Sequence, residues 1–140
     1  MQTLIRISLM FALVAASTQD HPRLFPKRSL CTLLKHRNTY RNAIVEVDGG
    51  VVSDGRHGII LTDMDCSQEG LPLDYPMSNA DKSVSQFESL VSESGTPGTI
   101  GRRVTGRFIG KVLVDSKTRR ISFALKQVVK VEATPDPSAP

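Results

Sequence analysis

The segment AIVEVDGGVVSDGRHGIILTDMDC, residues 43–66, decides the fold. Apolar residues alternate with polar or small ones from Ala43 to Ser53, which predicts a strand with one buried face. Asp54-Gly55 is a tight-turn signal, and residues 58–63 read as a second strand. The Gly49-Gly50 pair suggests a bulge or a sharp coil within the first strand. A strand pair at this point predicts a β-rich domain.

The first 17 residues have the pattern of a secretory signal. Arg6 precedes the apolar run ISLMFALVAA, and Ala15-Ala16-Ser17 supplies the small residues that signal peptidase needs. The run is shorter than the roughly 20 residues of a membrane-spanning helix. A buried helix of the domain is the alternative, but the run lacks an amphipathic period. The sequence predicts export to the periplasm or the medium, cleavage after Ala16 or Ser17, and no stable membrane anchor after cleavage.

Cys31 and Cys66 are the only cysteines. In an exported chain, two cysteines most simply form one disulfide, worth about 3.8 kcal/mol in the chain-entropy model for this loop. The alternatives are a redox-active pair and a zinc site that recruits two of the three histidines, His21, His36 and His57. Neither the CxxC nor the HxxxH spacing of such sites is present. We therefore predict a Cys31–Cys66 disulfide, no metal and no cofactor.

The charge of the chain is mildly basic. The 18 Lys+Arg and 14 Asp+Glu give +4, and loss of Arg6 with the signal leaves +3. A basic surface can attract nucleic acid, lipopolysaccharide or anionic lipid, but a charge of this size is also ordinary for a soluble domain.

The rest of the chain divides by its periodicity. Ser29 caps a short helix with leucines on one face, and Val84, Phe87, Leu90 and Val91 mark an amphipathic helix after the caps at 79–81. The predicted segments are an extended arm at 18–28, a helix at 30–36, strands at 43–53, 58–63 and 71–75, a helix after residue 81, strands at 100–114 and 119–132, and a disordered tail at 133–140.

The two long C-terminal strands each have a clear inward face. In the first, the expected inward residues are Ile100, Val104, Phe108, Val112 and Val114, and the outward ones are Arg103, Thr105, Arg107 and Lys111. Gly101, Gly106 and Gly110 recur along it, as in a strand that bends around a small barrel. In the second strand, Ile121, Phe123, Leu125 and Val129 are expected to point inward.

The order of elements predicts the fold class. Three strands, one helix and two strands, after a leading short helix, is the order of an OB-fold, a five-stranded partly open barrel. The prediction is thus a mainly β (α+β) fold with an OB-like domain at residues 29–132. An open antiparallel sheet with both helices on one face is the alternative.

Several short motifs resemble a group of small exported bacterial proteins whose functions are largely uncharacterised. They are Leu30-Cys31-Thr32-Leu33-Leu34, Tyr40, the Val45/Val47 strand, Ser53 to Gly58, Leu61, Asp65-Cys66 and Val104-Thr105-Gly106-Arg107-Phe108. The similarity covers residues 29–66 and 100–131. It implies export, a disulfide and a small β-barrel, and it transfers no activity and no functional residue.

Ligands of OB-folds usually meet loops between strands one and two and between strands four and five. Here those loops carry five candidate ligand-binding residues, Arg56, His57, Lys117, Arg119 and Arg120. If the loops lie on one side of the barrel, they can bind a phosphate, a carboxylate or an acidic sugar. The alternative is that both loops are solvated turns whose charges Asp54 and Asp115 partly cancel.

Other candidate surfaces are weaker. Arg103, Arg107 and Lys111 form a basic strand face that fits an envelope partner, or else a solvent face protected from aggregation by charge. Nucleic acid is an unlikely partner, since Tyr40 and Tyr75 alone offer stacking platforms. Ser53 and His57 belong to no GxSxG, HExxH or paired-acid motif, and catalysis is not expected. The prediction is a non-catalytic exported module for a small anionic or saccharide ligand or a protein partner, with an envelope-interaction protein or a weak single-strand binder as alternatives.

Overall fold

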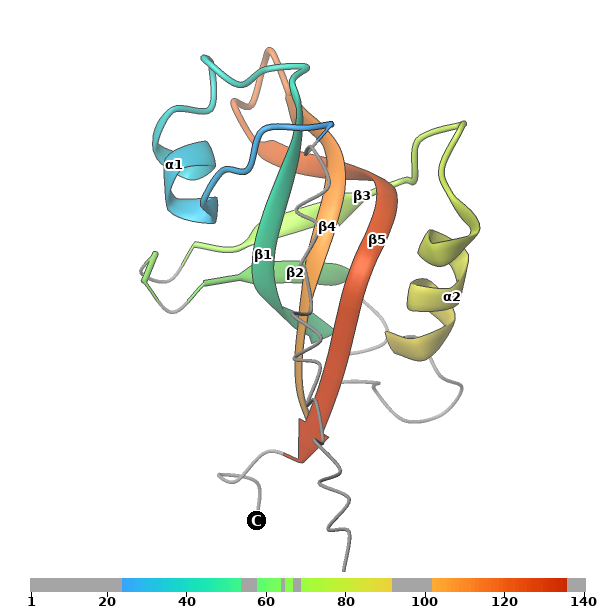
Figure 1. Cartoon of the computed structure of the whole chain (residues 1–140). Coiled ribbons are helices and arrows are strands. Elements are labelled where there is room, and N and C mark those ends of the chain that lie inside the picture. Colours follow the sequence, from blue (N-terminus) through green and yellow to red (C-terminus); the bar gives the residue numbers. More distant parts are fainter. Residues whose placement is uncertain (1–23, 54–57, 64, 67–68, 92–101, 136–140) are drawn as a thin grey trace, which may run out of the picture.

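The computed structural model describes residues 24–53, 58–63, 65–66, 69–91 and 102–135 (Figure 1). Within these residues the chain forms α1 (Leu30–Lys35), β1 (Ile44–Ser53), β2 (Ile59–Thr62), β3 (Leu71–Asp74), α2 (Lys82–Val91), β4 (Arg102–Val114) and β5 (Ile121–Pro135). The order is the predicted one. The signal segment at 1–17 and most of the arm at 18–28 lie outside the described residues.

The five strands close into a ring. Neighbours hydrogen-bond in the order β1-β2-β3-β5-β4, and β4 pairs again with β1. Every pair is antiparallel except β3 with β5, which is parallel and joins only Leu73 and Asp74 to their partners. The predicted mainly β fold with two helices, one of them between the third and fourth strands, is confirmed at this level.

α1 begins where the sequence placed it. The Ser29 hydroxyl oxygen accepts a hydrogen bond from the backbone N–H of Thr32 at 3.1 Å, which satisfies a donor in the first helical turn. The three leucines of α1 are buried in the core. The helix therefore packs by its apolar face, as predicted.

Gly49 in β1 gives α1 room to approach. A Cβ at Gly49 would lie 3.1 Å from Leu30 Cδ1 and 3.2 Å from the Thr62 carbonyl oxygen. The register of β1 with β4 runs without a shift through Gly49 and Gly50. Of the bulge or sharp coil predicted at these glycines, the bulge is therefore wrong, and Gly49 serves close packing.

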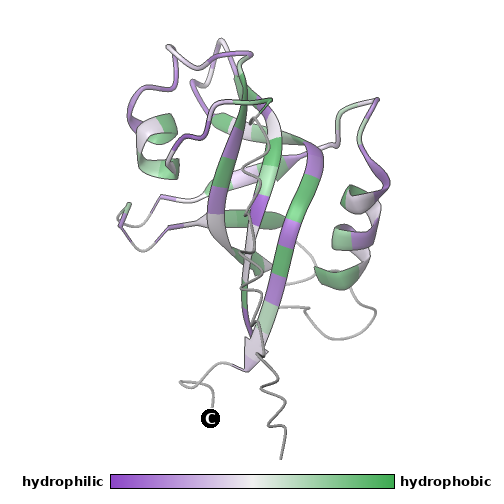
Figure 2. Cartoon of the chain, viewed as in Figure 1, coloured by the Kyte–Doolittle hydropathy of each residue, from purple (hydrophilic) through white to green (hydrophobic). Residues whose placement is uncertain are grey.

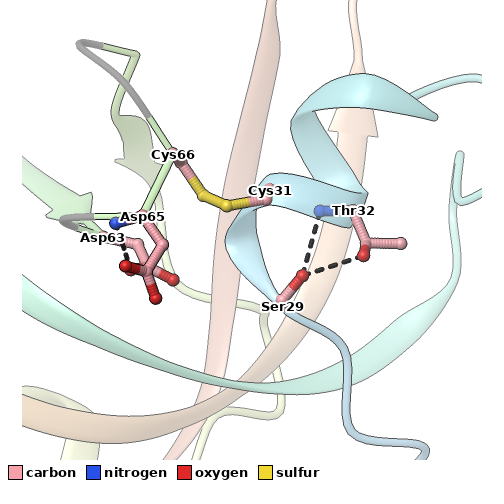
Figure 3. Close-up of a disulfide and its surroundings, with 6 residues drawn as sticks. All are labelled: Ser29, Cys31, Thr32, Asp63, Asp65 and Cys66. Carbon is pink, nitrogen blue, oxygen red and sulfur yellow. Dashed lines mark hydrogen bonds between the residues drawn. A yellow bond between two sulfur atoms is a disulfide. The ribbon is translucent and has the colours of Figure 1, made fainter.

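A disulfide joins Cys31 in α1 to Cys66 after β2 (Figure 3). Their Cα atoms are 5.0 Å apart, within the usual range for a disulfide. Cys66 is buried, and Cys31 packs against the same core. The predicted disulfide is confirmed, and it fixes the leading helix to the exit of the second strand.

α2 lies alongside β5 (Figure 1). The Asp81 carboxylate accepts a hydrogen bond from the Ser83 backbone N–H at 2.8 Å, and this bond holds the pKa of Asp81 below its ordinary value. Phe87 of α2 contacts Phe108 of β4 edge to face, with ring centroids 5.2 Å apart. The apolar stripe predicted for this helix is buried through Val84, Phe87 and Val91.

Two irregularities in the β4–β5 ladder change the inward face of β5. Gly110 pairs with Leu125 but Ile109 pairs with Gln127, and Phe108 pairs with Val128 but Arg107 pairs with Lys130. The pairing skips Lys126 and Val129, and each skip shifts the alternation of inward and outward residues along β5. Figure 2 shows polar and apolar bands along this strand. Val128 is buried and Val129 is 46% exposed, so the prediction of Val129 as an inward residue is wrong.

β5 also runs further than expected. It ends at Pro135 rather than at residue 132. Ala133, Thr134 and Pro135 pair with the start of β4. The predicted disordered tail therefore begins too early, and residues 136–140 lie outside the described residues.

The described part of the arm lies along β1. The Arg28 N–H donates to the Glu46 carbonyl oxygen at 2.9 Å, and the Glu46 N–H donates to the Pro26 carbonyl oxygen at 3.0 Å. Lys27 thereby forms a parallel bridge with Glu46. β2 pairs with β1 only from Gly50 onward, so the arm covers a part of β1 that β2 does not reach.

Candidate ligand-binding groove on the outer face of the ring

β4 carries a row of polar side chains on its outer face. The register with β1 is unbroken from Val104 to Lys111, so alternate residues keep the same face throughout. Arg103 and Thr105 are exposed, whereas Arg107 is half-buried. The predicted outward row is confirmed, and its role as an interaction face remains a prediction.

A groove of about 790 Å³ crosses the outer face of β1, β4 and β5. Arg103 and Arg107 line it, whereas Lys111 does not. Gly50 lies on its floor, between Thr62 of β2 and Thr105 of β4 in the register. The absent side chain keeps the groove open, because a Cβ at Gly50 would lie 3.1 Å from Thr62 Oγ1.

Carboxylates of β1 hold Arg107 at the side of this groove. Its Nε donates to Asp48 Oδ1 at 2.9 Å and lies 3.5 Å from Glu46 Oε1. Lys27 of the arm also pairs with Asp48. Burial by itself raises the pKa of Asp48, but the hydrogen bonds and charges of Lys27 and Arg107 outweigh it and hold this pKa below the ordinary value.

Positive donors remain available in the groove. Within the described part of the chain, Arg107 donates a side-chain hydrogen bond only through Nε, so both terminal amino groups are without a hydrogen-bond partner. The side chain of Arg103 likewise has no partner there. Of the acids that line the groove, Asp48 pairs as above, Glu132 pairs with Lys130 at 2.6 Å, and Asp63 accepts a hydrogen bond from the Asp65 N–H. The groove is therefore suited to a negatively charged ligand.

The lowered pKa of Asp48 gives a pH prediction. Because the folded protein binds this proton less readily than the unfolded chain, the stabilisation by Asp48 is present above the ordinary Asp pKa of about 3.9 and is lost as the pH falls below it. Thermal melts between neutral and acidic pH should show a smaller loss of stability for Asp48→Asn than for the wild type. Asp65→Asn, at an exposed carboxylate, is the control. If the stability of the wild type and of Asp48→Asn fell in parallel with pH, ionised Asp48 would not be the source of this stabilisation.

The turn between β4 and β5 is built by Asp115. Its carboxylate accepts hydrogen bonds from the backbone N–H groups of Thr118 at 2.6 Å and Lys117 at 2.9 Å, which lower the pKa of Asp115. Lys117, Arg119 and Arg120, all predicted to bind ligand, are exposed. Of the three, Arg120 lines a second groove, of about 940 Å³. Local hydrogen bonds account for the turn without any ligand.

The other predicted loop is attached at the opposite end of the ladder. Arg56 and His57 lie outside the described residues, and their role remains a prediction. Ile44 pairs with Lys111 near the end of β4, whereas Val51 pairs with Val104 near its start. The exit of β1 at Ser53 is therefore remote along the ladder from the turn at 115–120 (Figure 1). The β1–β4 ladder therefore does not bring the end of β1 close to the β4–β5 turn.

The group around the disulfide is not a preformed metal site. Ligand atoms of Cys31, Asp63 and Cys66 lie within 4.8 Å of one another (Figure 3). The two sulfurs are bonded to each other, so neither is the thiolate that zinc needs. One carboxylate oxygen of Asp63 accepts a hydrogen bond from the Asp65 N–H at 2.9 Å. The disulfide explains why these residues lie together.

Sequence reasoning missed Asp48 and Thr62 as parts of the groove, and Lys27 as the partner of Asp48. Lys27 lies in a stretch that gives no strand signal, and its partner becomes evident only when the arm lies along β1. The available signal was weak: β1 carries acids on its outer face, as β4 carries cations, and antiparallel pairing places opposite charges together.

Neither helix in the described part of the chain is long and apolar enough to cross a membrane. No family model matches this chain, and no curated protein matches it.

Proposed function

We propose that this protein is a small exported, non-catalytic binding module with an OB-type barrel, and that the groove of Arg103, Arg107 and Gly50 holds its ligand. The barrel is supported by the closed ring and by the helix between β3 and β4, which is the arrangement of that fold. Close contacts at Gly106 and Gly110 fit a strongly coiled sheet.

Export is supported by two independent features. The signal-like segment at residues 1–17 has the charged, apolar and small-residue parts that secretion requires. The Cys31–Cys66 disulfide persists best in an oxidising compartment such as the periplasm or the medium. Both features favour a place of action outside the cytoplasm.

The ligand that suits the groove is a small carboxylate or an acidic saccharide. The observation that carries this proposal is the set of unpaired guanidinium donors over a floor without a side chain. Arg107 is fixed through Nε, so its terminal amino groups are pre-positioned for a two-point contact with a carboxylate. The threonine hydroxyls of the lining can bind sugar hydroxyls.

Titration with galacturonic acid tests this function. We expect it to shift the amide resonances of Gly50 and Thr105, with galactose, which lacks the carboxylate, giving weaker shifts. Gly50→Val fills the floor and should hold the ligand away from the arginines. The loss of one hydrogen bond to a charged group costs about 1.5–3 kcal/mol, so binding should weaken tenfold or more. Arg119→Ala removes one cation from the β4–β5 turn and is the matched control.

Binding that survives Gly50→Val but is lost with Arg119→Ala would place the site at the turn and reject the groove. Melting curves of both variants show whether the fold is intact. If galacturonic acid binds neither the groove nor the β4–β5 turn, this proposal is rejected as well.

An envelope-interaction protein remains the second candidate. Lys111 is half-buried on the same outer face as the groove cations but outside the groove lining, so a broad protein contact would use it and a small ligand would not. Single-stranded nucleic acid is less well supported: the Tyr40 ring already lies 5.8 Å from the Arg28 guanidinium, and Tyr75 is the exposed one.

A further inference from the structure

We infer that the ligand of the groove is an elongated acid with two separated negative groups, and that an acidic oligosaccharide lying along β4 fits it best. This inference rests on the function proposed above. It starts from the spacing of Arg103 and Arg107, which are four residues apart on the same face of β4. At the usual rise per residue their Cα atoms are roughly 13 Å apart, so a ligand that lies along β4 can place one acidic group at each arginine.

The surface between the two arginines carries hydroxyl groups on its β4 and β2 sides, and on its β5 side Glu132 lies opposite Thr105 and pairs with Lys130. Thr105 lies between them on β4, and Thr62 borders the vacant space over Gly50 on the other side. Hydroxyl groups both donate and accept hydrogen bonds, which suits the neutral, hydroxyl-bearing part of a sugar chain. A cation, hydroxyl groups and a second cation therefore follow one another along the β4 side of the groove.

Other elongated acids fit less well. A peptide that adds as a strand needs free backbone donors and acceptors, but β1 and β4 at Gly50 and Thr105 already pair on both sides. A nucleic acid needs aromatic platforms, and no aromatic residue is among the described residues that line the groove. A saccharide needs neither.

The pairing of the local acids keeps the arginines accessible. Asp48 is shared by Lys27 and Arg107, and Glu132 is held by Lys130. Arg107 therefore offers its terminal amino groups at one end of the groove, and the unpaired guanidinium of Arg103 offers its donors at the other.

A length series of galacturonate oligomers tests the inference by calorimetry. We expect weak binding of the monomer and a gain of about tenfold or more once the oligomer is long enough for its carboxylates to reach both arginines, as expected for an added hydrogen-bonded charge pair. Neutral oligogalactosides of equal length should show no such gain.

Arg103→Ala should abolish the gain with length, so that the oligomers bind this variant no more tightly than the monomer does. Lys111→Ala removes one charge from the same strand outside the groove, and it should preserve the gain. Equal affinity for the monomer and the oligomers would overturn this inference while the proposed function stands. No binding at any length would overturn both this inference and the proposed function. Equal losses of oligomer affinity with Arg103→Ala and Lys111→Ala would show that diffuse charge attraction, and not a ligand aligned along β4, explains the binding, and would also overturn this inference.

Discussion

Replacement of both Cys31 and Cys66 by alanine is expected to lower the free energy of unfolding by about 4 kcal/mol. The bond spans a sequence separation of 35, and closure of such a loop removes conformational entropy from the unfolded chain. For a domain of this size, each kcal/mol moves the melting temperature by about 4 °C or more, so a decrease of about 15 °C is expected.

Thermal and urea unfolding of the wild type with and without a thiol reductant provides the control. The reduced wild type should melt close to the double variant, because both lack the link between α1 and the segment after β2. The variant itself should not respond to reductant. A variant as stable as the oxidised wild type would show that the disulfide does not hold the helix in place.

The second large effect is expected at Gly110 in β4. An added Cβ would lie 2.5 Å from the Ala124 carbonyl oxygen and 2.6 Å from the Phe123 ring. The oxygen belongs to the paired strand β5, so relief of the overlap requires the ladder to shift beside one of its irregularities. Gly110→Ala should therefore lower the free energy of unfolding by about 3 kcal/mol, at the upper end of overpacking effects.

Gly50→Ala is the matched control on β1. There the closest atom is the Thr62 hydroxyl oxygen at 3.1 Å, which side-chain rotation can move away. This change should cost less than about 1 kcal/mol, as for most substitutions outside the core. Denaturant melts of both variants give the comparison. Equal stabilities would mean that β4 and β5 separate more easily than their contact at Gly110 implies.

The sequence was sufficient for the elements because each strand and helix carries its own periodicity. The outward row of Arg103, Thr105 and Arg107 and the stripe of α2 could be read in this way. The alternation failed at Val129, because the two ladder irregularities depend on how β5 meets β4 and leave no local signal. Long-range pairing, which a single strand does not encode, decides such positions.

The candidate groove was only partly predictable for the same reason. Its cations were found on β4, but its floor at Gly50 first suggested a bulge, and its acid at Asp48 was seen only as the polar face of a strand. These residues acquire a common role through the β1–β4 register. The loops, favoured by analogy with other barrels, are attached at opposite ends of that ladder.

The arm along β1 has a consequence for solubility. A sheet that closes into a ring leaves few free edges, but the N–H and carbonyl of Glu46 would form one if residues 26–28 were absent. Exposed strand edges recruit other chains and promote aggregation. The arm thus acts as an edge guard, and a chain shortened past Arg28 would have a site for intermolecular strand pairing on the flank of its candidate groove.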